Sequence, residues 1–325
     1  MDTEGSDGGV DRISSLPDDL LLRILVHVAD TVAAARTSVL SHRWLHLWVH
    51  LPELCFRYEY GRDHISARAR AHESVDAALA AHARTTVTLL EVALPRWAPQ
   101  APVAVDGGGE KAAPWLLQFA SQRVAGELRL SLRHDRLSRH SGEIVVPPCE
   151  RATAITLDVD MLPLRFHLLA AAATFAALAM LRILKARVHS REVEDAVSSR
   201  CCPRLKELVL KYVALHDEPP VLSIFSDSLE RLEIVGLATV TRLKVIAPKL
   251  EILLAPRFRI SGAHIVAPKL LEVCWYGAYD PISDCIVKAG RHLQRLKIGP
   301  SSLATNLMLR FDTVHELQLT FEIRE

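Results

Sequence analysis

Histidine and cysteine are the residues of this sequence with the greatest potential for chemistry. The chain has 15 histidines, and His42, His46 and His50 are spaced four apart, so one helix could align their imidazoles on a single face. A zinc site would need further cysteine or carboxylate ligands at matching spacing, and none lies beside these three. We therefore expect them to form the solvent-exposed edge of a helix, and we predict no bound metal and no cofactor.

The signatures of the common hydrolases are missing. The sequence contains neither Gly-x-Ser-x-Gly nor His-Glu-x-x-His. Cys201 and Cys202 precede a proline and have no histidine in a recognised nucleophile context, so we interpret them as part of a buried turn. The 6 cysteines include no Cys-x-x-Cys pair of the kind that RING-type zinc domains repeat. The pattern predicts a non-catalytic protein with reduced thiols, as in the cytoplasm or nucleus.

Charge and hydropathy exclude two further classes of partner. The formal net charge is +1 and the chain has no run of lysines or arginines, so we expect no nucleic-acid partner. The most apolar segment, residues 168–181, is shorter than the roughly 18–20 residues that a membrane-spanning helix needs. Its alanine content predicts a buried helix packed on a sheet, and we expect no membrane association.

The elements that must position any functional surface begin in residues 11–48. Residues 16–19, Leu-Pro-Asp-Asp, place a proline and two acids in a first helical turn, where proline is tolerated and the helix dipole favours negative charge. Apolar residues at helical spacing follow, and Ser41 is the predicted N-cap of a short helix with two tryptophans. These helices carry more apolar surface than they can bury in one another. One interpretation is that they form the core of a small N-terminal subdomain.

A second interpretation comes from the motifs themselves. The run DRISSLPDDLLLRIL followed by ARTSVLSHRWLHLW closely resembles the F-box of plant F-box proteins with leucine-rich repeats. The Leu-Pro-Asp start and the Thr-Ser-Val-Leu-Ser-x-Arg-Trp-x-x-Leu-Trp end are recurrent features of that family. Both match in order and at compatible spacing, so the signal is specific.

The resemblance implies a substrate-recognition subunit of an SCF-type (Skp-cullin-F-box) ubiquitin ligase. The F-box would dock on a Skp-family adaptor, which links it to a cullin-RING ligase, while the repeats would present an unidentified protein substrate for ubiquitination and proteasomal degradation. Trp44 and Trp48 would be candidate anchors. The residues that the resemblance places against the adaptor are Leu16, Pro17, Leu20, Leu21, Ile24, Leu25, Val39, Leu40, Trp44 and Trp48.

One segment departs from the family pattern. Between the two motifs the family usually has a second Leu-Pro step, whereas residues 28–35 of this chain read Val-Ala-Asp-Thr-Val-Ala-Ala-Ala. We therefore expect the middle helix to start differently. An alternative hypothesis follows, in which the divergent F-box does not engage the adaptor and the protein is a non-degradative leucine-rich-repeat scaffold that binds other proteins.

Downstream, a Leu-x-x-Leu pattern recurs in the second half of the chain. Successive copies start 24, 24, 21, 20, 23 and 21 residues apart, within the range of about 20–29 residues for leucine-rich repeats. We interpret each copy as a short strand with its leucines in a continuous core, and each return segment as covering the other side. The sequence Ala-Pro-Lys-Leu occurs twice, and its proline ends the preceding element. The copies start at Leu181, Leu205, Leu229, Leu250, Leu270, Leu293 and Val314.

Together these patterns predict the fold class. We expect an α/β chain in which a small N-terminal helical F-box is followed by an irregular leucine-rich-repeat solenoid with a curved parallel sheet. The sequence does not identify the residues that bind the substrate. Trp275 and Tyr276 lie at a predicted strand end, and because side chains alternate between the faces of a strand, we expect one of them in the core.

Domain boundaries follow from changes in composition. The first ten residues are acidic and glycine-rich and lack the apolar run of a secretory signal. Residues 321–325 directly follow the last repeat strand, and a solenoid needs a cap over its last apolar face. We therefore expect a truncated chain, or an end covered by a further segment or partner. The predicted divisions are a disordered tail (1–10), the F-box (11–50), a helical connector (51–84) and the repeat domain (85–325) with a flexible loop (98–113).

Overall fold

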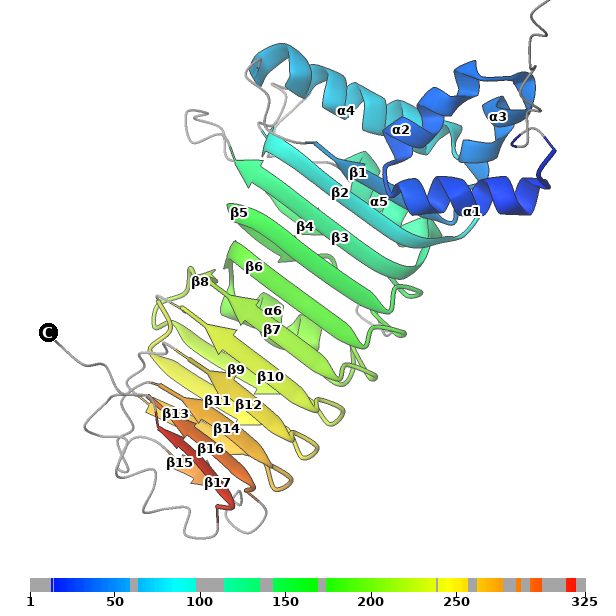
Figure 1. Ribbon diagram of the computed structural model, residues 1–325. Helices are drawn as coiled ribbons and strands as arrows, with labels where there is room; N and C mark the ends of the chain where they lie inside the picture. The colour runs from blue at the N-terminus through cyan, green and yellow to red at the C-terminus, as the bar shows by residue number, and fades with distance from the viewer. Residues whose placement is uncertain are drawn as a thin grey trace, which may run out of the picture.

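A group of short N-terminal helices is followed by a long solenoid of parallel strands (Figure 1). This arrangement confirms the predicted α/β class. The predicted tail and the predicted loop at 98–113 lie outside the described residues. The structure is a computed structural model that describes residues 13, 15–58, 64–97, 114–134, 143–168, 174–237, 239–256, 262–276, 285–287, 293–299 and 314–319.

The described helices are concentrated in the first part of the chain. The first begins directly after Pro17, as predicted, with two acids in its first turn. Ser41 precedes the helix with the tryptophans, although its side chain makes no capping hydrogen bond. The helices are α1 (Asp18–Val28), α2 (Thr31–Arg36), the 3-10 turn η1 (Thr37–Val39), α3 (His42–Leu47), the 3-10 turn η2 (Trp48–His50), α4 (His64–Ala81), α5 (Pro114–Arg123) and α6 (Ser190–Val197).

The strands form two parallel sheets. The main sheet follows the order of the chain and has the short strands β4 (Ile144–Val146) and β8 (Ala214–Leu215) paired to its side. Its strands are β1 (Glu53–Arg57), β2 (Val87–Trp97), β3 (Val124–His134), β5 (Ala154–Phe166), β6 (Met180–Val188), β7 (Glu207–Lys211), β10 (Arg231–Val235), β12 (Ile252–Ala255), β14 (Glu272–Trp275), β16 (Arg295–Ile298) and β17 (Glu316–Leu319). The small sheet contains β9 (Val221–Phe225), β11 (Arg242–Ile246), β13 (Gly262–Val266) and β15 (Cys285–Val287).

Columns of buried aliphatic side chains run beneath the main sheet. Leu208, Leu232 and Leu253 are in register on β7, β10 and β12, and all three are fully buried. The column continues through Val273 and Leu296. Because side chains alternate along a strand, the residues between them face outward. The leucine repeat therefore specifies both the strand and its buried face.

Tight turns precede β12 and β14 of the main sheet. In both Ala-Pro-Lys-Leu copies the leucine N–H donates to the alanine carbonyl, with Leu250 N to Ala247 O at 3.1 Å and Leu270 N to Ala267 O at 3.2 Å. The prolines therefore sit in turns before the strands, as predicted. In the copies that start at Leu205, Leu229, Leu250, Leu270 and Leu293, the strand begins two residues after the first leucine, which is buried in the turn. The first copy differs, because β6 begins at Met180 and Leu181 is in register with Leu208 within the strand.

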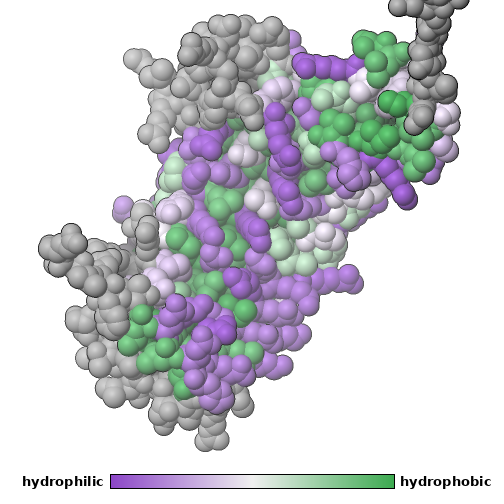
Figure 2. Space-filling model, viewed as in Figure 1, coloured by the Kyte–Doolittle hydropathy of each residue, from purple (hydrophilic) through white to green (hydrophobic). Residues whose placement is uncertain are grey.

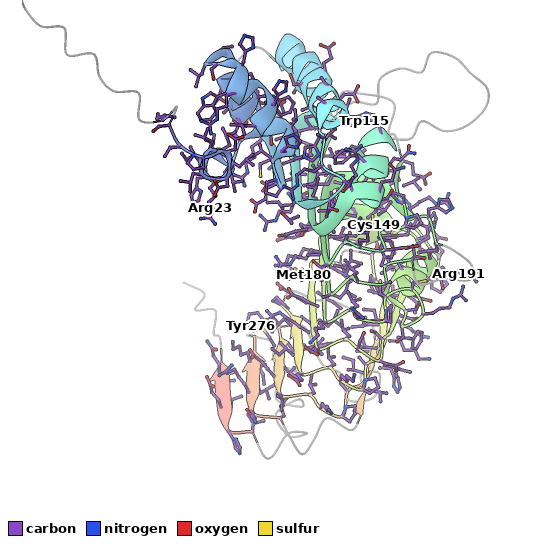
Figure 3. All side chains as sticks on the ribbon, turned by 90° about the vertical axis from the view of Figure 1, so that its right-hand side faces the viewer. Arg23, Trp115, Cys149, Met180, Arg191 and Tyr276 are labelled. Atoms are coloured by element: carbon purple, nitrogen blue, oxygen red, sulfur yellow. The ribbon has the colours of Figure 1, made fainter. Side chains whose placement is uncertain are left out.

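Behind the main sheet lies a second layer that changes from helices to strands along the chain. α5 packs against β3, and α6 packs against β5 and β9. From β9 onward the layer is the small sheet, whose sequences Arg-Leu-Lys-Val-Ile and Gly-Ala-His-Ile-Val contain the β-branched residues that favour strands. Figure 3 shows the two layers from the side, with side chains between them. Return segments thus cover the core as predicted, although their strands were not predicted.

Two segments differ in part from the predicted local structure. The expected helical connector at 51–84 does contain a helix, α4, but residues 53–57 form β1, whose Leu54 and Phe56 are fully buried and whose backbone pairs with β2. The expected helix at 168–181 is not formed in its described part, where residues 174–177 form a turn and Met180 starts β6. Leu181 instead joins a buried column of the main sheet. None of the described helices is long and apolar enough to cross a membrane.

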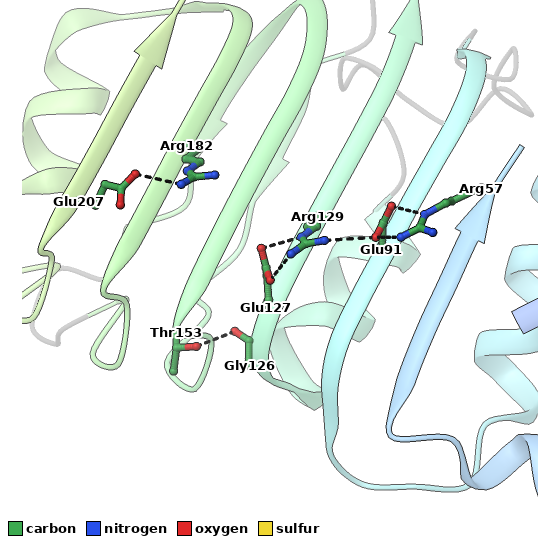
Figure 4. Close-up of polar contacts among 8 residues, drawn as sticks. All are labelled: Arg57, Glu91, Gly126, Glu127, Arg129, Thr153, Arg182 and Glu207. Carbon is green, nitrogen blue, oxygen red and sulfur yellow. Dashed lines mark hydrogen bonds and ion pairs between the residues drawn. The ribbon is translucent and has the colours of Figure 1, made fainter. Parts of the chain in front are cut away.

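The outer face of the main sheet is lined by ion pairs between neighbouring strands. Arg57 donates from Nε and Nη2 to the two carboxylate oxygens of Glu91, at 2.6 and 2.7 Å, and Arg129 contacts Glu91 and Glu127 (Figure 4). The Arg57 hydrogen bonds hold the pKa of Glu91 below its ordinary value. These pairs are partly solvated, so they contribute little to stability individually. They do compensate charges between neighbouring strands of this face.

The buried column predicts different outcomes for two adjacent leucines. Leu253→Ala removes a fully buried side chain and should lower the free energy of unfolding by about 2–5 kcal/mol. Leu254→Ala changes the next residue, which is half-buried on the outer face, and should cost about 1 kcal/mol or less. Urea unfolding of both variants and the wild type measures the difference. Equal losses would contradict the assigned register.

Candidate functional site

The first helix has an exposed apolar row beside its buried one. Leu21 and Leu25 are fully buried and pack in the core. Leu20, Ile24 and Val28 follow at four-residue spacing on the adjacent side and remain about two-fifths exposed. A helix in a stable monomer normally exposes polar residues outside its buried stripe. The second apolar side therefore points to contact with another molecule.

More apolar side chains are exposed between α2 and α3. Val39, in η1, is 88% exposed and Leu40, directly after it, is 66% exposed. Figure 2 shows hydrophobic surface gathered over the N-terminal helices. Clusters of exposed apolar side chains of this kind commonly mark interaction sites. The N-terminal patch, as we define it, consists of Ile13, Leu20, Ile24, Val28, Val39 and Leu40.

The structure separates the ten predicted adaptor-contact residues into three groups. Leu21, Leu25 and Trp44 are buried in the core, where they support the helices from inside. Leu16 and Trp48 are half-buried and pack against the same core. The exposed members are Pro17, Leu20, Ile24, Val39 and Leu40.

Sequence reasoning missed two exposed members of the N-terminal patch. Val28 continues the four-residue spacing of Leu20 and Ile24, and this spacing was the signal that could have identified it. Ile13 lies before the helix and carries no periodic signal. Both are more than two-fifths exposed.

Arg43 fixes α3 against the start of α1. Its guanidinium pairs with the Asp18 carboxylate at 2.6 Å and also donates to the Leu16 carbonyl. Asp18 lies in the first turn of α1, where negative charge is favourable. The contact holds Leu16 and α1 in a fixed position relative to the segment that exposes Val39 and Leu40.

The divergent segment at 28–35 forms an ordinary helix start. Ala29 adopts a left-handed conformation (φ 52°) that ends α1, and the Asp30 carboxylate accepts hydrogen bonds from Val32 N at 2.8 Å and Ala33 N at 3.1 Å. Asp30 is thus the N-cap of α2. Thr31 is buried and its hydroxyl accepts a hydrogen bond from Cys55 N at 2.8 Å. The segment therefore starts the middle helix at Thr31 and attaches it to β1.

A set of backbone hydrogen bonds joins the N-terminal helices to the solenoid. Ala83 N donates to Val49 O at 2.9 Å, and Thr88 N donates to Pro52 O at 2.8 Å. His82 lies between these contacts, is buried, and its Nε2 is 2.9 Å from Leu51 O. A carbonyl can only accept, so His82 Nε2 carries the proton. The junction is therefore a hydrogen-bonded interface and not a linker.

Histidines and cysteines do not assemble into a reactive site in the described part of the chain. His42, His46 and His50 are exposed, and no cluster there of three or more histidine, cysteine or acidic side chains could hold a metal ion. Burial raises the pKa of Cys149 and of Cys202 to about 12. These thiols stay protonated near neutral pH and are poor nucleophiles.

Comparison with known proteins identifies the family. No family model matches the chain. Over 231 residues it is 30% identical to an Arabidopsis thaliana protein described as an FBD-associated F-box protein, with 69% of this chain and 47% of that protein covered. It is also 48% identical over 48 residues to F-box/LRR-repeat protein 25 of Arabidopsis thaliana, covering 15% of this chain and 19% of that protein. The chain belongs to the plant F-box/LRR proteins.

This F-box/LRR chain spans about half the length, or less, of the curated relatives it matches. A second FBD-associated F-box protein of Arabidopsis thaliana is 28% identical over 231 residues, which are 70% of this chain and 50% of that protein. The residues that resemble an F-box form α1, α2, η1 and α3, and the solenoid behind them carries the repeats. The likeness therefore covers both parts of the described fold.

His82 makes the junction between F-box and solenoid sensitive to acid. Burial, with smaller contributions from Arg123 and Arg84, lowers the pKa of His82 below its ordinary value of 6.5. Protonation would add an N–H at Nδ1, which has no hydrogen-bond partner among the described residues. The neutral form is favoured in the folded state, so its contribution to stability is complete above pH 6.5 and is lost as the pH falls from there towards the lowered pKa.

The corresponding prediction compares wild type with His82→Gln. Glutamine can still donate to Leu51 O but does not titrate, so the variant should lose less free energy of unfolding than wild type as the pH falls below 6.5. Urea unfolding at a series of pH values measures the difference between the two profiles. Parallel profiles would contradict the assignment.

Proposed function

We propose that this F-box/LRR protein is a substrate-recognition adaptor of an SCF-type ubiquitin ligase. The N-terminal patch docks on a Skp-family adaptor, and the solenoid presents a protein substrate for ubiquitination and proteasomal degradation. The names of its relatives support the family, and the proposed partners follow from the F-box. We also propose the cytoplasm or nucleus as its location, since the buried cysteines are free thiols.

The observation that carries this proposal is the exposure of the N-terminal patch. Leu20, Ile24, Val39 and Leu40 come from two separate elements and are all accessible to a partner. Complete burial of one such side chain is worth about 1.5–3 kcal/mol before the costs of association. A few of these contacts supply the affinity of a stable complex. Their helices are already held in place by Arg43 and Asp30.

The burial pattern also changes which residues act as anchors. Trp44 is only 7% exposed and Trp48 is half-buried, so neither presents a large free surface. Val39 and Leu40 protrude most and are the better candidates for insertion into a pocket of the adaptor. The tryptophans support them from the core. Ubiquitin transfer itself would require only that the complex hold the substrate near the charged enzyme.

Binding to a purified Skp-family adaptor tests the proposal. Val39→Asp and Leu40→Asp each place a charge in the proposed interface and should weaken binding by at least about tenfold. Met161→Asp is the control, because Met161 is also an exposed apolar side chain, 40% exposed, but lies on the solenoid. Isothermal titration calorimetry gives the affinities, and urea unfolding verifies that each variant is folded.

Two outcomes would contradict the adaptor proposal. Wild-type protein that does not bind the adaptor would favour the alternative of a non-degradative repeat scaffold. Equal binding by wild type and Leu40→Asp would remove the N-terminal patch as the docking surface. A loss of binding in Met161→Asp as large as in Leu40→Asp would also contradict the assigned location.

A further inference from the structure

The two sheets of the solenoid differ in whether their positively charged side chains form ion pairs. On the outer face of the main sheet, cations pair with carboxylates of neighbouring strands: Arg182 with Glu207 at 3.0 Å, and Lys211 with Glu233 at 2.6 Å. The same holds for Arg57, Arg129, Lys185, Arg295 and Lys297. These seven cations are compensated within the chain, and Figure 2 shows the hydrophilic side chains of this face distributed along the sheet.

Cations of the small sheet have no such partners. Arg242 and Lys244 lie on β11, are exposed, and form no ion pair with any described carboxylate. Lys249 and Lys269 occupy the turns that lead from this sheet to β12 and β14, and they too are exposed and unpaired within the described chain. The sequences of β9, β11 and β13 contain no acidic residue. The charge of this surface is therefore uncompensated by its own strands.

Register brings these positive charges close together. Lys244 is in register with His264 on the neighbouring strand. Ile252 and Glu272 are in register, and Lys249 and Lys269 each stand three residues before them. The two lysines are thus one strand spacing apart at the backbone, about 4.8 Å. Like charges at this spacing destabilise a sheet, and the Ala-Pro-Lys-Leu repeat places them there twice.

An apolar row runs between the two groups of cations. Phe225, Ile246 and Val266 are in register on β9, β11 and β13. Phe225 is 39% exposed, and the Lys244 ammonium lies 5.3 Å from the centre of its ring. Ile246 and Val266 are half-buried. The surface therefore has Arg242 and Lys244 on one side, an apolar row in the middle, and the turn lysines on the other side. We call it the basic face.

We propose that the basic face binds an acidic segment of a partner protein, with carboxylates against the two groups of cations and an apolar side chain on the Phe225 row. Charge complementarity identifies this partner, since the sheet offers unpaired cations and no acid of its own. The basic face and the outer face of the main sheet lie on opposite sides of the solenoid. The F-box lies on the side of the main sheet's outer face (Figure 3). Binding here would leave the N-terminal patch free, whether or not it is occupied by an adaptor.

The apolar row distinguishes a protein segment from other anions. A nucleic-acid backbone presents phosphates and sugars, and single strands bind mainly by stacking bases on several aromatic rings. Phe225 is the one aromatic residue in β9, β11 and β13. On an anionic membrane surface the long lysine side chains would contact the headgroups, and the apolar row set below them would make no contact. A peptide with alternating acidic and aliphatic residues matches all three rows.

Fluorescence anisotropy with a defined probe tests the proposal on the full chain. The probe is a labelled Gly-Glu-Leu-Glu-Glu-Leu-Glu-Gly peptide, and the comparison peptide has glutamine in place of each glutamate. Lys244→Glu and Lys269→Glu should each weaken binding by about threefold to tenfold, and added salt should weaken wild-type binding. Arg23→Glu is the matched control, because Arg23 is an exposed cation on α1, at the other end of the molecule (Figures 1 and 3).

Phe225→Ala should also weaken binding, without changing its dependence on salt. All four substitutions are at exposed positions, and urea unfolding verifies that the variants are folded. No binding of the acidic peptide, or equal binding by wild type and Lys244→Glu, would overturn the proposal. Tighter binding of oligothymidylate, or of phosphatidylserine vesicles, than of the acidic peptide would overturn the assigned class of partner.

Discussion

Parallel pairing of each coil with the one before it is the constraint on which the structure depends. At the start of a strand, two successive backbone N–H groups donate to one carbonyl of the preceding coil. Lys206 N and Glu207 N both donate to Ala179 O, and Glu230 N and Arg231 N both donate to Lys206 O. Beneath these contacts the aliphatic columns must stay in register. A shift by one residue would turn every buried leucine outward. No coil can bury its apolar side alone, so the coils are stable only as a stack.

The same constraint explains what could be predicted from sequence. Leu208 and Leu210 are buried, as are their equivalents Leu232, Ile234, Leu296 and Ile298 in later coils, so the spacing recurs and identifies the strand. Return strands such as β11 and β13 have no common motif, since they need only suitable residues at alternating positions. Trp275 is buried while Tyr276 is half-buried, which confirms that one of the pair lies in the core. β1 is a single strand of five residues before the repeat begins, and local pattern alone does not distinguish it from a connector.

The exposed apolar patch on the N-terminal helices was predictable in its location but not in its orientation. Leu20 and Leu21, and likewise Ile24 and Leu25, are adjacent apolar residues, so helical periodicity cannot decide which member of each pair faces inward. Packing against the other N-terminal helices decides it and buries Leu21 and Leu25. Tryptophans suggested anchors because they are large, yet their size makes them core residues here. His82 carried no signal, because its role arises from Leu51, 31 residues earlier in the chain.

The hydrogen-bonded junction fixes the distance of each coil of the solenoid from the F-box. Because β1 follows the F-box directly and forms the first strand of the main sheet, the position of each coil relative to the F-box is set by counting strands. Moving a bound protein from β7 to β14 crosses three strand spacings, roughly 14 Å. Inserting or deleting one whole coil would shift every later coil by about 4.8 Å and leave the F-box unchanged. The number of coils therefore sets how far any surface of the solenoid lies from the F-box.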